Sequence, residues 1–306
     1  TCSPDEGGVL DGRLSLITIR GLVCFGLQAP SYFTKLPTLL RQPAMQDLKD
    51  TQNELDTRQI SIDRVGVRGV RFPIVVSDKE QRTQSTVATV ALMVDLPEKY
   101  KGTHMSRFVE ALHEHKRYLD VRTAVRLPNR LLTKLHAQRA RVEVEFPFFR
   151  LKKAPVSGME GMMDYEVRFE IDAEVGKPGQ FTLTLKVPVT TLCPCSKAMS
   201  EHGAHNQRGI VTYSVRFSGK AVWIEDLIDL IEGCASCQLY SILKRPDEKY
   251  VTDKAYENPV FVEDLVRNVA VATEHYNAFS WYRVEAENFE SIHNHSAYAM
   301  VERNLG

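Results

Sequence analysis

Two segments of this 306-residue chain alternate between apolar and polar residues too regularly to be helical. They are ARVEVEFPFFRL, residues 140–151, and MDYEVRFEIDAEV, residues 163–175. Successive side chains of a β-strand point to opposite faces, so this alternation predicts strands with one buried and one solvated face. Residues 180–190 and 209–218 continue the pattern. The second half of the chain is therefore expected to build an antiparallel sheet.

The first half of the chain shows strand signals followed by helix signals. Residues 60–76 and 86–97 are rich in β-branched side chains and are separated by a polar stretch, which predicts a long hairpin. Residues 103–115 and 129–140 then predict two helices. Two strands followed by two helices form the first expected unit.

The order repeats in the second half, where helices are expected after the strands. They fit residues 223–245 and 258–277, the second with Asn258 as its cap and Pro259 in its first turn. Residues 279–290, FSWYRVEAENFE, read as a last strand. The predicted fold class is α+β with antiparallel hairpins.

The N-terminal residues differ from the rest of the chain. Residues 1–55 combine a Gly/Asp-rich start, an isolated apolar patch and a polar stretch, which predicts a poorly ordered or atypical arm. Packing of this arm on a partner subunit is the alternative, and Met45 is a plausible start of translation. Residues 56–306 are expected to form one domain of two units, approximately 56–139 and 140–306.

Composition excludes several classes of protein. Lys+Arg and Asp+Glu both number 39, so the chain lacks the basic excess of a nucleic-acid binder. No apolar run approaches the ~20 residues that span a bilayer, and Arg20 interrupts the weak signal-peptide candidate at residues 14–27. Six cysteines are too few for a disulfide scaffold. A cytoplasmic protein without nucleic-acid or membrane partners is expected.

Reactive side chains concentrate in TLCPCSKAMSEHGAHNQRG, residues 191–209, between two expected strands. A loop that folds back would bring Cys193 to His205, and thiolate plus imidazole suits zinc, or iron or manganese. A catalytic zinc takes about three protein ligands and a water. Asp247 and Glu248, in KRPDEKY, offer the missing carboxylate.

A structural four-thiolate site is a competing interpretation of the cysteines. It would use Cys193, Cys195, Cys234 and Cys237. Cys234 and Cys237 lie inside a predicted helix, and the Cys-x-Cys spacing departs from the usual two-residue gap of such sites. These two cysteines are therefore interpreted as core residues at helical spacing.

Four motifs together resemble the type IB GTP cyclohydrolases. They are CPCSKAMSEHGAHNQRG, LYSILKRPDEKYVTDKAYENPVFVEDLVR, THMSRF and SIHNHSAYA. The resemblance covers roughly residues 56–300. It implies the tunnelling fold, with tandem two-strand, two-helix units in a homo-oligomeric barrel. A homotetramer with active sites at subunit interfaces is the implied assembly.

The resemblance also implies the reaction and the ligands. The activity would be GTP cyclohydrolase I, a hydrolase of C–N bonds in cyclic amidines that releases 7,8-dihydroneopterin 3′-triphosphate and formate in folate synthesis. A divalent metal, zinc or manganese or iron, would be bound by Cys193, His205 and Glu248. Glu263 would anchor guanine, whose ring N–H and exocyclic amine present two donors to a carboxylate.

The remaining implied roles are proton transfer and phosphate binding. His293 and His295 are the candidates for acid–base catalysis, with His293 preferred, because imidazole titrates near neutral pH. Arg107, Arg208 and Lys197 are the candidates for contacts to the triphosphate.

Other functions stay open on the sequence. A related reductase of a 7-deazaguanine nitrile would use Cys193 or Cys195 as its nucleophile. An archaeal-type cyclohydrolase that yields a cyclic phosphate and a non-catalytic purine-binding oligomer are further alternatives. The histidine in the cysteine loop favours a metal over the reductase.

Overall fold

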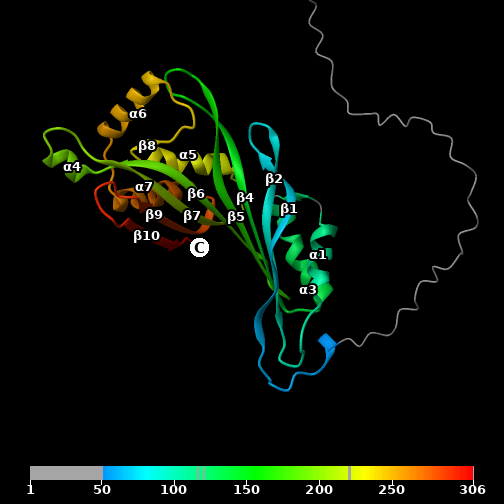
Figure 1. Cartoon of the computed structure of the whole chain (residues 1–306). Helices are drawn as coiled ribbons and strands as arrows, with labels where there is room; N and C mark the ends of the chain where they lie inside the picture. Colours follow the sequence, from blue (N-terminus) through cyan, green and yellow to red (C-terminus); the bar gives the residue numbers. More distant parts are fainter. Residues whose placement is uncertain (1–50, 116, 120, 220–221, 306) are drawn as a thin grey trace, which may run out of the picture. The chain divides into compact units, whose positions relative to one another are not determined.

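A ten-stranded sheet carries the fold, and its long strands come from the alternating segments (Figure 1). In a computed structural model, which describes residues 51–115, 117–119, 121–219 and 222–305, the spatial order is β10-β9-β7-β6-β5-β4-β2-β1-β3, and β8 pairs with β6. The strands are β1 (Ile62–Asp78), β2 (Arg82–Leu96), β3 (Tyr118–Leu119), β4 (Arg139–Lys153), β5 (Glu160–Glu174), β6 (Gln180–Leu192), β7 (Asn206–Phe217), β8 (Cys237–Gln238), β9 (Phe279–Asn288) and β10 (Ala297–Asn304).

Two groups of helices cover different parts of this sheet. The α1 and α3 helices pack on the strands of the first half and on β4 and β5, whereas α5 packs on β6 and α7 on β9 and β10 (Figure 1). The helices are α1 (Met105–Glu114), α2 (Val121–Ala124), α3 (Arg126–Leu135), α4 (Pro194–Met199), α5 (Ile224–Cys234), α6 (Arg245–Glu257) and α7 (Val262–His275), preceded by a 3₁₀ turn at Thr51–Asn53. The α+β class is thus confirmed.

The two faces of β4 show why alternation predicted the sheet correctly. Val142 and Val144 are buried in the core, which contains residues from both groups of helices. Arg141, directly before Val142, lies on the other face and pairs with Glu170 and Asp172 of β5. Apolar burial on one face and ion pairing on the other is the arrangement that a period of two encodes.

The helix expected over residues 223–245 was predicted too long. It ends at Cys234, and β8 then pairs with β6 through Val189 and Thr190. The pairing of β5 with β6 ends at Lys186 of β6. The residues of β6 beyond Lys186 are therefore free to pair with β8 on the side where β5 lies. Backbone pairing to a distant strand overrode the local helical pattern.

Other helix boundaries also differ from the prediction, and the helix expected over residues 129–140 is α3, which begins at Arg126 and ends at Leu135. Arg245, expected to end a helix, begins α6, and Phe261 rather than Asn258 is the N-cap of α7. Asn258 instead donates its side-chain amide to the carbonyl of Ala235 at 3.0 Å. One more strand, β10, follows the segment that was expected to be the last.

The described residues lie within the unit Asp50–Gly306. Most of the predicted arm, residues 1–55, lies outside the described residues. Within the described ranges, each helix is too short or too polar to cross a membrane.

Candidate active site

Cys193 and His205 meet at one end of the sheet, where the chain leaves β6 and returns as β7. Leu192, the last residue of β6, pairs with Asn206, the first residue of β7. Directly beyond this pair, the amide of Cys193 donates to the carbonyl of His205 at 3.1 Å. The loop therefore folds back as its sequence indicated, with α4 on the outgoing side.

Cys193 is held as the N-cap of α4. Its sulfur accepts a hydrogen bond from the amide of Ser196 at 3.4 Å, and Pro194 occupies the first turn, where an amide would lack a partner. The Ser196 hydroxyl donates to the Cys193 carbonyl at 3.0 Å and accepts from the His205 amide at 3.2 Å. Cys195 is exposed on α4. Cys193 is thus the cysteine that shares a hydrogen-bonded loop with His205.

The imidazole of His205 is oriented by two side chains that the sequence analysis missed. Its Nδ1 lies 2.9 Å from Oε1 of Gln207 and 3.7 Å from a carboxylate oxygen of Glu290. The amide nitrogen of Gln207 donates to the hydroxyl of Thr191 at 2.9 Å. The one sequence signal for Glu290 is its place just before the paired histidines of SIHNH.

The structure distinguishes the two carboxylates of KRPDEKY. Asp247 is fully buried and accepts hydrogen bonds from the amides of Val156, Ser157 and Lys244 and from the Ser157 hydroxyl. Burial alone would raise the pKa of Asp247, but these hydrogen bonds outweigh it and hold the pKa well below its usual range. The oxygens of Asp247 are therefore engaged, and Glu248 is the exposed neighbour.

Glu248 precedes residues of α6 that line a cavity. Thr252, one turn later in α6, donates to the Glu248 carbonyl at 2.7 Å. Thr252 and Val251 line a cavity of about 230 Å³ whose walls also include Gln207 and Arg208. Glu248 itself is exposed and is not among the residues that line this cavity.

Within the described part of the chain, no three His, Cys, Asp or Glu side chains are gathered closely enough to hold a metal ion. This applies to Cys193, His205 and Glu248 and equally to the four-thiolate alternative. Burial raises the pKa of Cys234 to about 11 and raises that of Cys237 as well, as expected for packed thiols. The two do not share one helix as predicted, because Cys237 lies in β8.

The chemistry of Cys193 and His205 fits a divalent metal. Cys193 offers sulfur, and the engaged Nδ1 of His205 leaves Nε2 as the nitrogen that would bind an ion. Thiolate and imidazole are the ligands that zinc prefers. A second hydrogen bond on the non-ligating ring nitrogen is usual for metal-binding histidines.

The histidine pair lies in a segment that runs beside this loop. His293 and His295 are exposed between β9 and β10, with stacked rings whose centroids are 5.0 Å apart. The segment starts where the amide of Phe289 donates to the carbonyl of Arg208 at 2.9 Å. It continues through Glu290 next to His205. Both candidate acid–base groups are therefore close in sequence to a residue that touches the cysteine–histidine loop.

The other predicted substrate contacts are dispersed. Glu263 is exposed in the first turn of α7. Lys197 donates to the carbonyl of Tyr256 at 2.5 Å and lies 4.4 Å from the centre of its ring, so it is engaged by the end of α6. Arg107 lies in α1, which packs on α3 and β1 and not on the loop of Cys193 (Figure 1).

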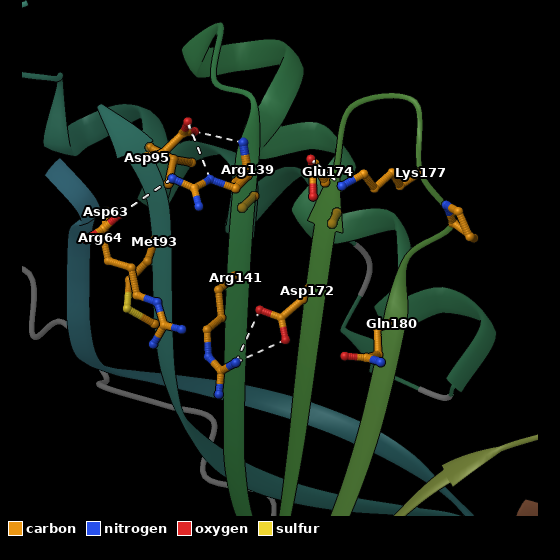
Figure 2. A pocket seen from close by; sticks show the side chains of 14 residues that line it. Asp63, Arg64, Met93, Asp95, Arg139, Arg141, Asp172, Glu174, Lys177 and Gln180 are labelled. Atoms are coloured by element: carbon orange, nitrogen blue, oxygen red, sulfur yellow. Dashed lines mark hydrogen bonds and ion pairs between the residues drawn. The ribbon is translucent and has the colours of Figure 1, made fainter. Parts of the chain in front are cut away.

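A cavity of about 780 Å³ lies at the opposite end of β6 (Figure 2). Gln180 lines it, whereas Leu192 precedes the cysteine loop, and the 13-residue strand separates the two sites by about 40 Å. Its charges are largely paired with one another: Arg139 with Asp95, Arg141 with Asp172, and Lys177 with Glu174. This cavity is distinct from the candidate active site.

Sequence comparison matches most of this chain to one family of known proteins. Residues 48–299 match the family model described as type I GTP cyclohydrolase folE2. The GTP cyclohydrolase FolE2 of Akkermansia muciniphila is 72% identical over 262 residues, which are 85% of this chain and 99% of that protein. The FolE2 of Magnetococcus marinus is 53% identical over 83% of this chain and 96% of that protein. The chain belongs to the type I GTP cyclohydrolase FolE2 family.

Solved structures give only a weak likeness. Uricase from Arthrobacter globiformis aligns with a TM-score of 0.45 at 8% identity over 80% of this chain and 94% of that chain. Urate oxidase from Bacillus subtilis aligns with a TM-score of 0.47 at 9% identity, over 80% and 99%. The family assignment depends on the sequence relatives alone.

Proposed function

We propose that this chain converts GTP and water into 7,8-dihydroneopterin 3′-triphosphate and formate, the first step of tetrahydrofolate biosynthesis. Membership of a GTP cyclohydrolase family supports the activity. The structural observation that carries the proposal is the hydrogen bond that closes the loop of Cys193 onto His205. It places a sulfur and an imidazole on the same short loop.

Cys193, His205 and Glu248 would hold a divalent metal, zinc or manganese or iron. Glu248 comes from α6, so closing the site requires α6 and the loop of Cys193 to approach each other. Such a metal, when bound, supplies Lewis acidity that lowers the pKa of water toward about 7. The hydrogen bonds of Asp247 support this arrangement because they fix the start of the helix that carries Glu248.

GTP is oriented by its two ends. The carboxylate of Glu263 accepts the ring N–H and exocyclic amine of guanine, a two-donor fork that a carboxylate matches. Arg208 on β7 and Lys197 on α4, within the loop, bind the triphosphate, and Lys197 leaves the Tyr256 carbonyl to do so. His293 and His295 move protons to the ring nitrogens as carbon 8 is attacked and formate leaves.

The active site is completed between copies of the chain. Arg107 lies on another part of the sheet, and an interface site would bring it to the phosphates from a neighbouring copy. Residues 56–306 form a bimodular tunnelling-fold domain in this proposal, assembled as a homotetrameric barrel in the cytoplasm. In the described part of the chain β10 pairs with β9 alone, and Tyr298 and Met300 on it are 59% and 46% exposed.

The decisive experiment compares two cysteines of the same loop. Cys193→Ser should lose tight metal binding and formate release from GTP, whereas Cys195→Ser should keep a large part of both. Metal per chain is measured by plasma mass spectrometry and formate by a coupled dehydrogenase assay, with native mass spectrometry reporting the assembly. A Cys193→Ser protein with wild-type metal content and turnover would end the proposed ligand role.

A further inference from the structure

We infer that Gln207 is a positioning residue that keeps the proton of the neutral His205 imidazole on Nδ1 and so presents the lone pair of Nε2 to a cation. The ligand role of His205 rests on the proposed function. The position of the proton does not, because it is a property of the metal-free protein.

The backbone of His205 is fixed on both sides. Its carbonyl accepts from the amide of Cys193 at 3.1 Å, and its amide donates to the hydroxyl of Ser196 at 3.2 Å. The imidazole is therefore attached to a backbone that cannot shift without breaking the hydrogen bonds that link it to Cys193 and Ser196 at the start of α4. What remains to be set is the rotation of the imidazole and the nitrogen that bears its proton.

Two oxygen atoms face the same ring nitrogen. Oε1 of Gln207 is 2.9 Å from Nδ1, and a carboxylate oxygen of Glu290 is 3.7 Å from it. The side chains of His205 and Glu290 are only 13% and 14% exposed, so water screens this contact weakly. A bare Nδ1 would direct its lone pair at a carboxylate, whereas a protonated Nδ1 donates to the amide oxygen. The geometry favours the proton on Nδ1.

The other end of the Gln207 amide contacts a buried hydroxyl. Its Nε2 donates to the hydroxyl of Thr191, which is fully buried, and Gln207 itself is 8% exposed. If the amide were reversed, an N–H would donate to Nδ1 and force the proton onto Nε2. The Thr191 hydroxyl can accept or donate and so accommodates either orientation of the amide. The carboxylate of Glu290 beside Nδ1 is the contact that favours the arrangement with Oε1 of Gln207 toward the ring.

The consequence for binding follows from the tautomer. A cation can bind only the unprotonated nitrogen. A histidine in the wrong tautomer must therefore first move its proton, and the free energy of that change weakens cation binding. Loss of partners of this kind typically costs 10- to 100-fold in metal affinity. Gln207→Leu should show a loss of this size, and Gln207→Glu, which keeps an acceptor beside Nδ1, should recover most of it.

The test reads the proton directly. Metal-free protein with ¹⁵Nδ1-labelled histidine is examined by solid-state NMR at about pH 8.5, where imidazoles are neutral, and the His205 line is identified by its loss in His205→Asn. Wild type and Gln207→Glu should show a protonated Nδ1. Gln207→Leu should show a mixture or a bare nitrogen, and Gln180→Leu, at the far end of β6, should match wild type.

The zinc affinity of the same proteins is measured by competition with a chelating dye. A bare Nδ1 in wild type would overturn the inference, and so would a Gln207→Leu protein with the wild-type tautomer and affinity, which would assign the role to Glu290. If Gln207→Leu does not fold, a bare Nδ1 in wild type still overturns the inference. A protonated Nδ1 together with unchanged zinc binding in Cys193→Ser would sustain the tautomer and reject the proposed ligand set.

Discussion

Ser157 and Asp247 are joined by two hydrogen bonds, of 2.8 Å from the amide and 2.6 Å from the hydroxyl, although 90 residues separate them. Asp247 also accepts from the amide of Lys244 at the start of α6. One carboxylate therefore ties the turn between β4 and β5 to the helix that carries Glu248.

Asp247→Asn should destabilise the protein at neutral pH and less so in acid. The pKa of Asp247 is lower in the folded protein than the ordinary value of about 3.9, so its contribution is complete above that value and is lost as pH falls through the folded pKa. Urea unfolding between pH 7 and pH 3 measures the difference in free energy. Asp253→Asn, exposed on the same helix, is the control. A wild-type-to-variant difference that stays constant down to pH 3 would contradict the assignment.

Removal of one partner of the buried pair of Lys152 and Glu232 should destabilise the protein strongly, whereas replacement of both partners should destabilise it much less. The ammonium lies 2.8 Å from both carboxylate oxygens, the residues are 8% and 4% exposed, and Tyr165 donates to the same carboxylate at 2.9 Å. Lys152→Met leaves an uncompensated charge and should cost about 3–5 kcal/mol in unfolding free energy. Lys152→Met combined with Glu232→Gln should recover most of this. Equal instability of the single and double variants would show that packing, not charge, dominates.

Glu263→Gln should weaken GTP binding with little effect on the fold. One amide end of glutamine donates instead of accepting, so the two-donor fork of guanine loses an acceptor. Hydrogen bonds to charged groups contribute about 1.5–3 kcal/mol, which corresponds to roughly 10- to 150-fold in affinity. Calorimetric titration with GTP measures this loss of affinity, and Asp264→Asn is the neighbouring control. Unchanged affinity in Glu263→Gln would assign the guanine contact elsewhere.

His293→Asn should lower kcat by about 10²- to 10⁴-fold, the usual contribution of general acid–base catalysis, while GTP affinity changes little. His275→Asn, an exposed histidine at the end of α7, should retain wild-type kcat. Formate release at saturating GTP is the measurement. A His293→Asn protein with wild-type turnover would transfer the role to His295.

The sequence by itself determined the long central strands of the sheet and the loop between β6 and β7. Alternation in β4 and β5 is a local property of the chain, because side chains on a strand change face at every residue. The return of Cys193 to His205 followed from two strands that pair on either side of one loop. Both needed only neighbours in sequence or in a hairpin.

Tertiary structure alone decided which polar groups are engaged. Asp247 and Glu248 are equivalent by spacing, and only the distant hairpin at Ser157 occupies the first and leaves the second exposed. The end of α5 and the contact of Glu290 with His205 likewise depend on strands brought together from far along the chain. Hydrogen bonds of this kind leave no periodic trace in the sequence, because their partners are set by the packing of the sheet.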